Sequence, residues 1–156
     1  MASGVTYQWE PFSGCIHEAL PLIIRHSEEI EDARFGMIDP DYDALYAWER
    51  AGMFHVFTAR DEGRLVGYLG WLVFNHPYYR TKRTARTQMF WLDPVYRSGW
   101  TGYLLFKNCI PGLRQLGAVN ADFLYRPGFE ALRGGLARLF SRLGGKLDET
   151  GYRIWL

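Results

Sequence analysis

Cysteine is scarce in this 156-residue sequence, and the two that occur, Cys15 and Cys109, are isolated. Neither has a second cysteine at metal-binding spacing, so we expect reduced, buried thiols rather than a disulfide framework. The four histidines contain no pair at positions i and i+4, and the stretch that begins His17-Glu18 ends on Pro21 where a zinc-protease helix needs histidine. No metal site is predicted.

Long apolar runs are missing as well. The longest nearly apolar stretch, Leu65 to Phe74, is well below the roughly 18 residues that a membrane-spanning helix needs. No basic segment followed by an apolar one opens the chain, as a signal peptide requires. With 48% apolar and 22% charged residues, the composition is that of a folded protein. We therefore expect a single soluble, cytoplasmic domain over residues 1–156.

Charge of either sign is unevenly distributed. Residues 1–62 hold 4 Arg and 12 Asp or Glu, a net charge of −8, whereas residues 63–156 hold 14 Lys or Arg and 5 Asp or Glu, a net charge of +9. A solvated surface can acquire such a pattern by chance. The other interpretation is that one domain carries two sites, one for a cation and one for an anion.

Apolar spacing predicts a short strand and two helices in the acidic half. Val5, Tyr7 and Trp9 alternate with polar residues, as in a half-buried strand. A first helix follows, with Pro21 in its first turn or at a bend; its apolar positions are Ile16, Ala19, Leu20, Ile23 and Ile24. A second helix begins with Asp39 as a possible N-cap and Pro40 as first residue, and has Tyr42, Leu45, Tyr46 and Met53 on one face.

Strand-like alternation begins at Phe54. We predict a hairpin of residues 54–59 and 65–74, a basic loop over 77–86 and a strand over 87–92. A helix over 101–116, which Pro111 kinks or stops, and a strand over 119–125 follow. The chain then forms a helix over 130–143, ended by Gly144-Gly145, and a last strand over 152–156. This order predicts an α/β protein of the α+β kind, with a mixed, mostly antiparallel sheet flanked by about four helices.

The junction after the strand 87–92 is the most informative segment. There Asp93-Pro94 ends a strand, a turn with Gly99 and Gly102 follows, and a helix begins. Successive backbone N–H groups at such a place suit a phosphate, and Arg97 adds a positive charge. The same pattern also occurs in ordinary strand-to-helix connections.

The element order and this junction together resemble the GCN5-related N-acetyltransferase superfamily. The local likeness is to the Arg/Gln-x-x-Gly-x-Gly/Ala acetyl-CoA loop of that family. Aligning Gly102 with the last position puts Arg97 first and Trp100 in the place of the middle glycine; aligning Gly99 with the middle glycine puts Tyr96 first and Thr101 last. The resemblance implies acetyl-CoA as co-substrate, with its pyrophosphate held by the loop residues Arg97, Ser98, Gly99, Trp100, Thr101 and Gly102.

The resemblance also implies that the backbone of Phe90 and Leu92 binds the pantetheine arm like an added strand. Phe140 occupies the place of a tyrosine that protonates the CoA thiolate in many such enzymes, so Tyr103, Tyr78 or water is expected to serve instead. His26-Ser27-Glu28-Glu29 and His76-Pro77-Tyr78 are similar to segments of acetyltransferases from phage genomes, and a phage-encoded member would act in the host cytoplasm.

A general base is needed to deprotonate the acceptor amine. If these two segments converge, His76 is the base and Glu29 orients it or holds the amine, with His26 nearby. The resemblance therefore implies an N-acetyltransferase that transfers an acetyl group to a primary amine by direct transfer in a ternary complex. The acceptor, a small molecule or a protein, and the oligomeric state, including a homodimer, stay open.

Two alternatives remain. The basic segment 80–86, flanked by Tyr78 and Tyr79, is of a kind that stacks on bases and neutralises phosphates in a nucleic acid. A catalytically silent structural protein, such as a virion protein, is the other alternative, motivated by Phe140 and by the replaced glycine.

Overall fold

The computed structural model describes residues 4–30, 33–125, 130–148 and 153–156, which belong to two compact units. The first unit, Met1–Arg126, contains in chain order β1 (Val5–Glu10), α1 (Phe12–Ile30), a 3-10 turn η1 (Ala33–Phe35), α2 (Tyr42–Arg50), β2 (Phe54–Asp61), β3 (Arg64–His76), β4 (Tyr79–Leu92), a second 3-10 turn η2 (Pro94–Tyr96), α3 (Thr101–Gln115) and β5 (Ala118–Asp122). The second unit, Pro127–Leu156, contains α4 (Glu130–Arg142).

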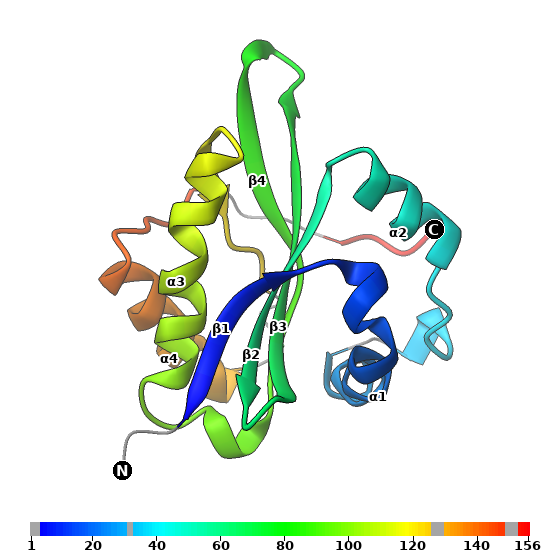
Figure 1. Ribbon diagram of the computed structural model, residues 1–156, viewed down its shortest axis with the longest axis vertical. Helices are drawn as coiled ribbons and strands as arrows, with labels where there is room; N and C mark the ends of the chain where they lie inside the picture. Colours follow the sequence, from blue (N-terminus) through cyan, green and yellow to red (C-terminus); the bar gives the residue numbers. More distant parts are fainter. Residues whose placement is uncertain (1–3, 31–32, 126–129, 149–152) are drawn as a thin grey trace. The chain divides into compact units, whose positions relative to one another are not determined.

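The five strands form one sheet in the order β1-β2-β3-β4-β5 (Figure 1). Neighbouring strands are antiparallel except β4 and β5, which are parallel because α3 carries the chain back between them. The predicted fold class, an α+β protein with a mixed, mostly antiparallel sheet and about four helices, is confirmed.

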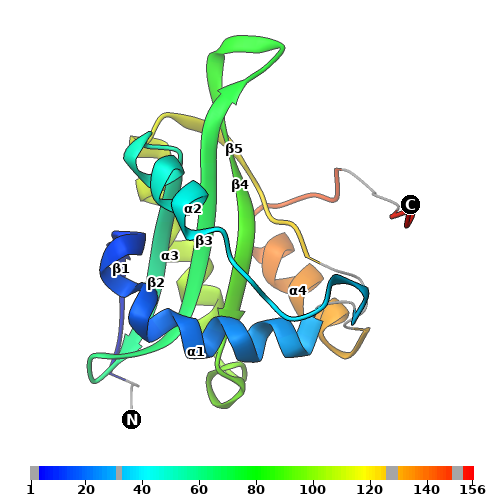
Figure 2. The same cartoon turned by 90° about the vertical axis from the view of Figure 1, so that its right-hand side faces the viewer.

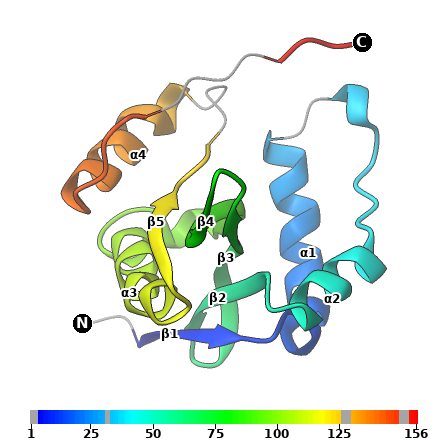
Figure 3. The same cartoon turned by 90° about the horizontal axis from the view of Figure 1, so that it is seen from above.

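Helices cover both faces of the sheet: α1 and α2 lie on one side and α3 on the other (Figure 3). On the α1 side the core includes Phe12, Ile16, Val56 and Tyr68, all less than one-tenth exposed. On the α3 side Phe123 lies edge-on to both Trp71 and Phe106, with ring centroids 5.2 and 5.3 Å apart. Apolar side chains therefore alternate between two core layers along the central strands.

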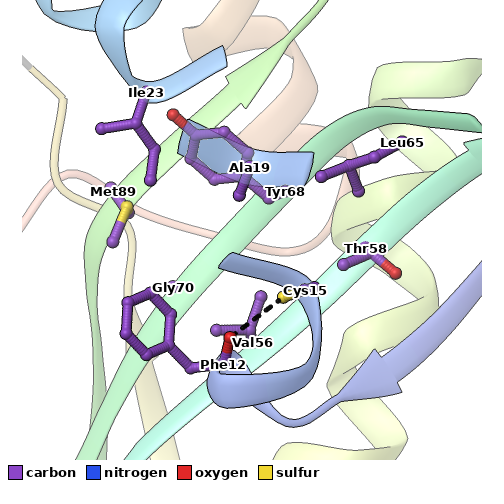
Figure 4. Close-up of a pocket in the computed structure, with 10 residues that line it drawn as sticks. All are labelled: Phe12, Cys15, Ala19, Ile23, Val56, Thr58, Leu65, Tyr68, Gly70 and Met89. Atoms are coloured by element: carbon purple, nitrogen blue, oxygen red, sulfur yellow. Dashed lines mark hydrogen bonds between the residues drawn. The ribbon is translucent and has the colours of Figure 1, made fainter. Parts of the chain in front are cut away.

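A small pocket lies between α1 and the strands, and Figure 4 shows its lining. Most of the lining is apolar, and the Cys15 thiol there donates to the Phe12 carbonyl at 3.7 Å. Burial raises the pKa of Cys15 to about 11, so the thiol stays protonated at neutral pH. This space belongs to the core, because it offers almost no polar group to a ligand.

The N-terminal half of the fold departs from expectation at one helix start. α2 begins at Tyr42 rather than at Pro40, and its N-cap is Asp41 rather than Asp39: the Asp41 carboxylate accepts from the Ala44 N–H at 2.9 Å. Two aspartates at alternate positions are equivalent in sequence, and the one whose carboxylate reaches a free N–H becomes the cap. Pro21 and Pro111 lie inside α1 and α3, and neither ends its helix.

The basic segment 77–86 is mostly strand rather than loop, because β4 begins at Tyr79. Tyr79 and residues 83–86 pair with β3 on one side, and residues 83–86 also pair with β5 on the other. The polar side chains gave no sign of this strand in the sequence, because strand pairing uses the backbone and leaves alternate side chains in solvent. The predicted last strand is also wrong where it is described: Arg153–Leu156 has no strand structure, and Tyr152 lies outside the described residues.

Candidate functional site

The parallel strands β4 and β5 separate halfway along β4. β5 pairs only with residues 83–86 of β4, and the last pair is Arg86 with Asp122. Beyond that pair, Thr87 and residues 89–92 of β4 still pair with β3, whereas no strand of the described residues pairs with the edge of β4 that faces β5. A sheet that opens in this way offers unpaired backbone to an extended ligand.

Thr87 and Gln88 mark the place where the strands separate. The register of β4 against β3 passes from Met89 opposite Gly70 to Thr87 opposite Trp71, which leaves Gln88 as an extra residue in a bulge. The Thr87 hydroxyl donates to the Asp122 carbonyl at 3.4 Å and accepts from the Leu124 N–H at 2.8 Å. This side chain therefore replaces the next backbone pairing between β4 and β5.

The strand register also shows which backbone groups face the opening. The Asp93 N–H donates to the Val66 carbonyl at 2.8 Å, so residues 93 and 66 form a hydrogen-bonded pair. Such pairs alternate with non-bonded pairs along an antiparallel ladder. Leu92 opposite Gly67 and Phe90 opposite Leu69 are therefore non-bonded pairs, whose N–H and C=O groups point away from β3 and toward the open edge.

The loop after β4 ends in a helix N-terminus without a side-chain cap. Gly99 has a φ of +96°, and the N-cap Trp100 makes no capping bond with its side chain. The first intrahelical bond of α3 runs from the Leu104 N–H to the Trp100 carbonyl, so the preceding N–H groups of the helix have no partner within it. These donors, together with the positive end of the helix dipole, are able to bind an anion such as a phosphate.

Arg97 points to the α1 side of this loop. Its Nε donates to the Leu92 carbonyl at 2.7 Å, and one terminal nitrogen contacts the two Glu29 carboxylate oxygens at 2.8 and 3.0 Å. The guanidinium also lies over the Trp91 ring, 5.6 Å from its centroid. The expected cation is therefore at the loop, but Glu29 neutralises it.

Trp91 is the centre of a polar and aromatic cluster beneath this pair. Its Nε1 donates to Glu29 at 3.1 Å, Arg25 lies over the ring at 5.2 Å, and Tyr68 stacks on it. The Tyr68 hydroxyl lies 2.8 Å from His26 Nδ1. Burial first, and then the charge of Glu29, raise the pKa of Tyr68, so the phenol keeps its proton at neutral pH.

His76 and Glu29 do not meet, and their expected pairing is wrong. His76 lies at the tip of the β3–β4 hairpin, where its Nδ1 accepts from the Tyr78 N–H at 3.2 Å. Tyr68, near Glu29, is on the same strand at roughly 3.3 Å per residue, or about 25 Å away. Figure 2 shows the hairpin tip and α1 at opposite ends of the sheet. Since Tyr78 shares the tip, neither side chain lies at the β4–β5 opening.

The other two aromatic candidates are placed differently. Tyr103 is in the first turn of α3, beside the uncapped N-terminus; it lies edge-on to Trp100, and Lys107 lies over its ring at 5.6 Å. Phe140 belongs to the second unit, near the end of α4. The helix ends as predicted at Gly144-Gly145, where the Gly145 N–H donates to the Phe140 carbonyl at 2.9 Å and Gly144 has a φ of +83°.

Two arginines of the basic hairpin are already bound to other groups of the protein. Arg83 donates to the carbonyls of Leu116, Val73 and Gly52 at 2.7, 3.3 and 3.4 Å. Arg86 pairs with Asp122 at 3.3 Å. Arg80 and Lys82 are exposed, beside Tyr78 and Tyr79, which are 87% and 65% exposed. The surface that a nucleic acid could contact is therefore smaller than the sequence indicates.

Asp122 and Thr87 are the functional candidates that sequence reasoning missed. Asp122 accepts from Asn120 Nδ2 at 3.0 Å and pairs with Arg86, on the last residue before the strands separate. Arg86 is opposite Leu72, which packs on the α1 side, so Asp122 belongs to the face that α1 and α2 cover. No sequence motif marks either residue, because their role depends on where β5 stops pairing.

Among the described residues, no helix is long and apolar enough to cross a membrane. Over the same residues, no three His, Cys, Asp or Glu side chains group into a possible metal site.

No family model matches the sequence, and no curated protein matches it significantly. Solved structures do resemble it. An aminoglycoside acetyltransferase from an uncultured soil metagenomic sample has a TM-score of 0.75 at 14% identity, covering 97% of this chain and 96% of its own. A ribosomal-protein-alanine N-acetyltransferase from Brucella melitensis biovar Abortus has a TM-score of 0.72 at 15% identity, with 98% and 99% covered.

A GCN5-related N-acetyltransferase from Ralstonia eutropha has a TM-score of 0.70 at 20% identity, covering 97% of this chain and 99% of its own. None of these likenesses supports a phage origin. At such low identity they establish the fold alone. The chain has the fold of the GCN5-related N-acetyltransferases.

Proposed function

We propose that this protein is an N-acyltransferase that uses acetyl-CoA and transfers the acetyl group directly to a primary amine in a ternary complex. The observation that carries the proposal is the opening between β4 and β5, where unpaired backbone of β4 leads to an uncapped helix N-terminus. An extended amide-containing arm that ends in a diphosphate matches both features. The acetyltransferases with the same fold support this reading.

We assign the binding of acetyl-CoA, the acyl donor, to two groups of residues. Phe90 and Leu92 would bind the pantetheine arm through backbone groups that face the opening. The phosphates would be held by the loop and first helical turn, which comprise Ser98, Gly99, Trp100, Thr101 and Gly102. Because the Leu92 carbonyl accepts from Arg97, the arm is left with the Leu92 N–H and both backbone groups of Phe90.

The acceptor ammonium first loses one proton to a base. The free amine then forms a C–N bond with the acetyl carbon, the C–S bond breaks, and a second proton passes from the nitrogen to the departing thiolate. His76 and Tyr78 lie too far from the opening for these steps. Asp122 is the carboxylate at the opening, on the α1–α2 face, and we assign it to contact the acceptor ammonium and take its proton. Tyr103 is a phenol beside the donor loop, in the first turn of α3.

Calorimetric titration with acetyl-CoA tests the proposed function. We expect saturable binding with one site per chain, and acetylation of simple primary amines with release of free thiol. No heat of binding at millimolar acetyl-CoA would remove the proposal. Binding without turnover on any amine would support the catalytically silent alternative.

Nucleic-acid binding is the second candidate, and the hairpin tip favours it. No Asp or Glu occurs from Gly63 to Leu92, and Tyr78 and Tyr79 are exposed beside Arg80 and Lys82. Tyrosines can stack on bases while the cations neutralise phosphates. A gel shift with single-stranded RNA should then weaken steeply with salt and disappear in an Arg80→Gln, Lys82→Gln variant. No shift at low salt excludes this function.

A further inference from the structure

Arg97 is held away from the proposed donor site by three contacts. The Leu92 carbonyl binds its Nε, the two oxygens of Glu29 bind a terminal nitrogen, and the Trp91 ring lies under the guanidinium. Trp91 faces α1, whereas Phe90 next to it contacts Phe106 of α3. The guanidinium is therefore on the opposite side of the sheet from the helix whose N-terminus would bind phosphate.

Glu29 is itself fixed. Its Oε1 accepts from the Trp91 indole as well as from Arg97, so the carboxylate is bound to β4 independently of the arginine. This arrangement joins the C-terminal part of α1 to the loop between β4 and α3. A second contact of the same kind, Arg25 with Asp93 at 3.6 Å, lies beside it.

The Arg97–Glu29 pair is also exposed enough to exchange. The side chains are 26% and 29% exposed, and pairs at such positions are worth little net free energy because water competes for both partners. A diphosphate carries more negative charge than one carboxylate, and arginine binds it with paired hydrogen bonds. Glu29 therefore holds Arg97 with little net free energy, and a phosphate bound at the same loop can compete for the guanidinium.

We propose that Glu29 and the phosphates of the donor compete for Arg97. In the free protein Glu29 holds the guanidinium on the α1 face; when the donor binds, Arg97 turns to the phosphates and the Glu29 carboxylate keeps only Trp91. Glu29 is thus a positioning residue that lowers donor affinity and couples α1 to the donor loop. This inference rests on the proposed function.

Calorimetry with acetyl-CoA on matched variants tests the competition. Glu29→Gln keeps the bond from Trp91 but removes the charge that holds Arg97, and should tighten acetyl-CoA binding about twofold to fivefold, the range of an exposed ion pair. Glu28→Gln is the control, because it removes the same charge one residue away on the exposed surface of α1. It should change the affinity by clearly less.

The second arm is a double-mutant cycle with Arg97→Gln. In the Arg97→Gln background, Glu29→Gln should not tighten acetyl-CoA binding further, because the guanidinium for which Glu29 and the phosphates compete is gone. Inorganic pyrophosphate, titrated in parallel, should also bind more tightly to Glu29→Gln than to the unmodified protein, because the charge of the phosphates competes with Glu29. A merely structural role for Glu29 predicts weaker binding in Glu29→Gln and a lower melting temperature instead.

The outcomes separate the inference from the proposed function. If the unmodified protein does not bind acetyl-CoA, the proposed function fails and the inference fails with it. If it binds and Glu29→Gln binds equally well or more weakly, the competition is overturned while the proposed function stands. A gain equal to that of Glu28→Gln would also overturn it, since general electrostatics would then explain both.

Discussion

Gly99 is the residue on which the shape of the donor loop depends. Its φ of +96° lies in the region that costs other residues about 1 kcal/mol or more, while a Cβ there would meet no atom within 4 Å. Gly99→Ala should therefore alter the loop backbone without a steric clash. We expect acetyl-CoA to bind roughly threefold to tenfold more weakly by calorimetry.

Gly36 provides the matched control for this change. It also has a positive φ, +77°, and open space around its Cα, but it lies in the segment before α2. Gly36→Ala should carry a similar conformational cost and leave acetyl-CoA affinity unchanged. Equal losses of affinity in both variants would mean that the effect comes from stability and not from the loop.

Asp122 is the residue to which we assign the acceptor amine. Asp122→Asn keeps the size and the ability to accept from Arg86 but loses the charge and the basicity. We expect kcat to fall about 100-fold, within the range of general base catalysis, with acetyl-CoA affinity little changed. Steady-state rates of thiol release measure kcat, and calorimetry measures the affinity for acetyl-CoA.

The control for Asp122→Asn is Asp39→Asn, an exposed acid ahead of α2. Its rates should match those of the unmodified protein. An Asp122→Asn variant with full kcat would show that water or another group accepts the proton.

At the scale of elements, Thr87 joins β4 to the end of β5 and the segment after it, at the place where the two strands separate. This side chain is 3% exposed and bridges the two strands through the Asp122 carbonyl and the Leu124 N–H. Thr87→Val keeps the volume and removes both bonds, which should lower the free energy of unfolding by about 1–3 kcal/mol. Urea unfolding measures the loss.

Thr81→Val is the matched control in the same strand, because Thr81 is exposed on the hairpin. Its stability should stay within about 0.5 kcal/mol of that of the unmodified protein. If Thr87→Val is equally neutral, the two hydrogen bonds of the Thr87 hydroxyl contribute nothing to stability.

Sequence patterns predicted the elements well, and the site only in part. Apolar periodicity located β1, the central strands and the helices, since burial of one face leaves a repeat in the sequence. The donor loop was visible because glycines and a helix start are local features. The opening was not, because the end of β5 pairing depends on a contact between Thr87 and Leu124, far apart in the chain.

The same limit explains the error over His76. A histidine beside a tyrosine is typical of a catalytic segment, but its distance from Glu29 is set by the length of β3, which extends to His76. The residues after His76 are polar and do not alternate with apolar ones, so the sequence gives no sign that the hairpin continues there. Long-range placement is what single-sequence patterns do not encode.

At the scale of the whole molecule, contacts inside the first unit join the acidic half of the sequence to the basic half. Glu29 pairs with Arg97 and Arg25 with Asp93, each joining the first half of the chain to the second. The Tyr96 hydroxyl donates to Asp61 at 2.6 Å, again across the two halves. The first pair takes an acid from the acidic half and the second takes a base from it, so these contacts join the two halves without reducing the difference between −8 and +9.

Acid stability should depend on one ion-pair network that joins β1, β2 and α1. Arg60 binds Glu10 at 2.7 Å and Glu18 at 2.8 Å, and the side chains of Arg60 and Glu10 are only 12% and 15% exposed. The bond from Arg60 lowers the pKa of Glu10 to about 2, against the opposing effect of burial, and also lowers the pKa of Glu18. Because the folded-state pKa is below the unfolded one, this stability is present above about pH 4.5 and is lost as the pH falls toward 2.

Glu10→Gln should therefore lower stability at pH 7 by about 1–3 kcal/mol and flatten the fall in melting temperature between pH 5 and about 2. Thermal unfolding followed by circular dichroism across that range measures both. Glu28→Gln, which removes an exposed carboxylate from α1, should keep the full pH dependence. Parallel melting curves for Glu10→Gln and the unmodified protein would mean that Glu10 is not the group whose protonation unfolds the molecule in acid.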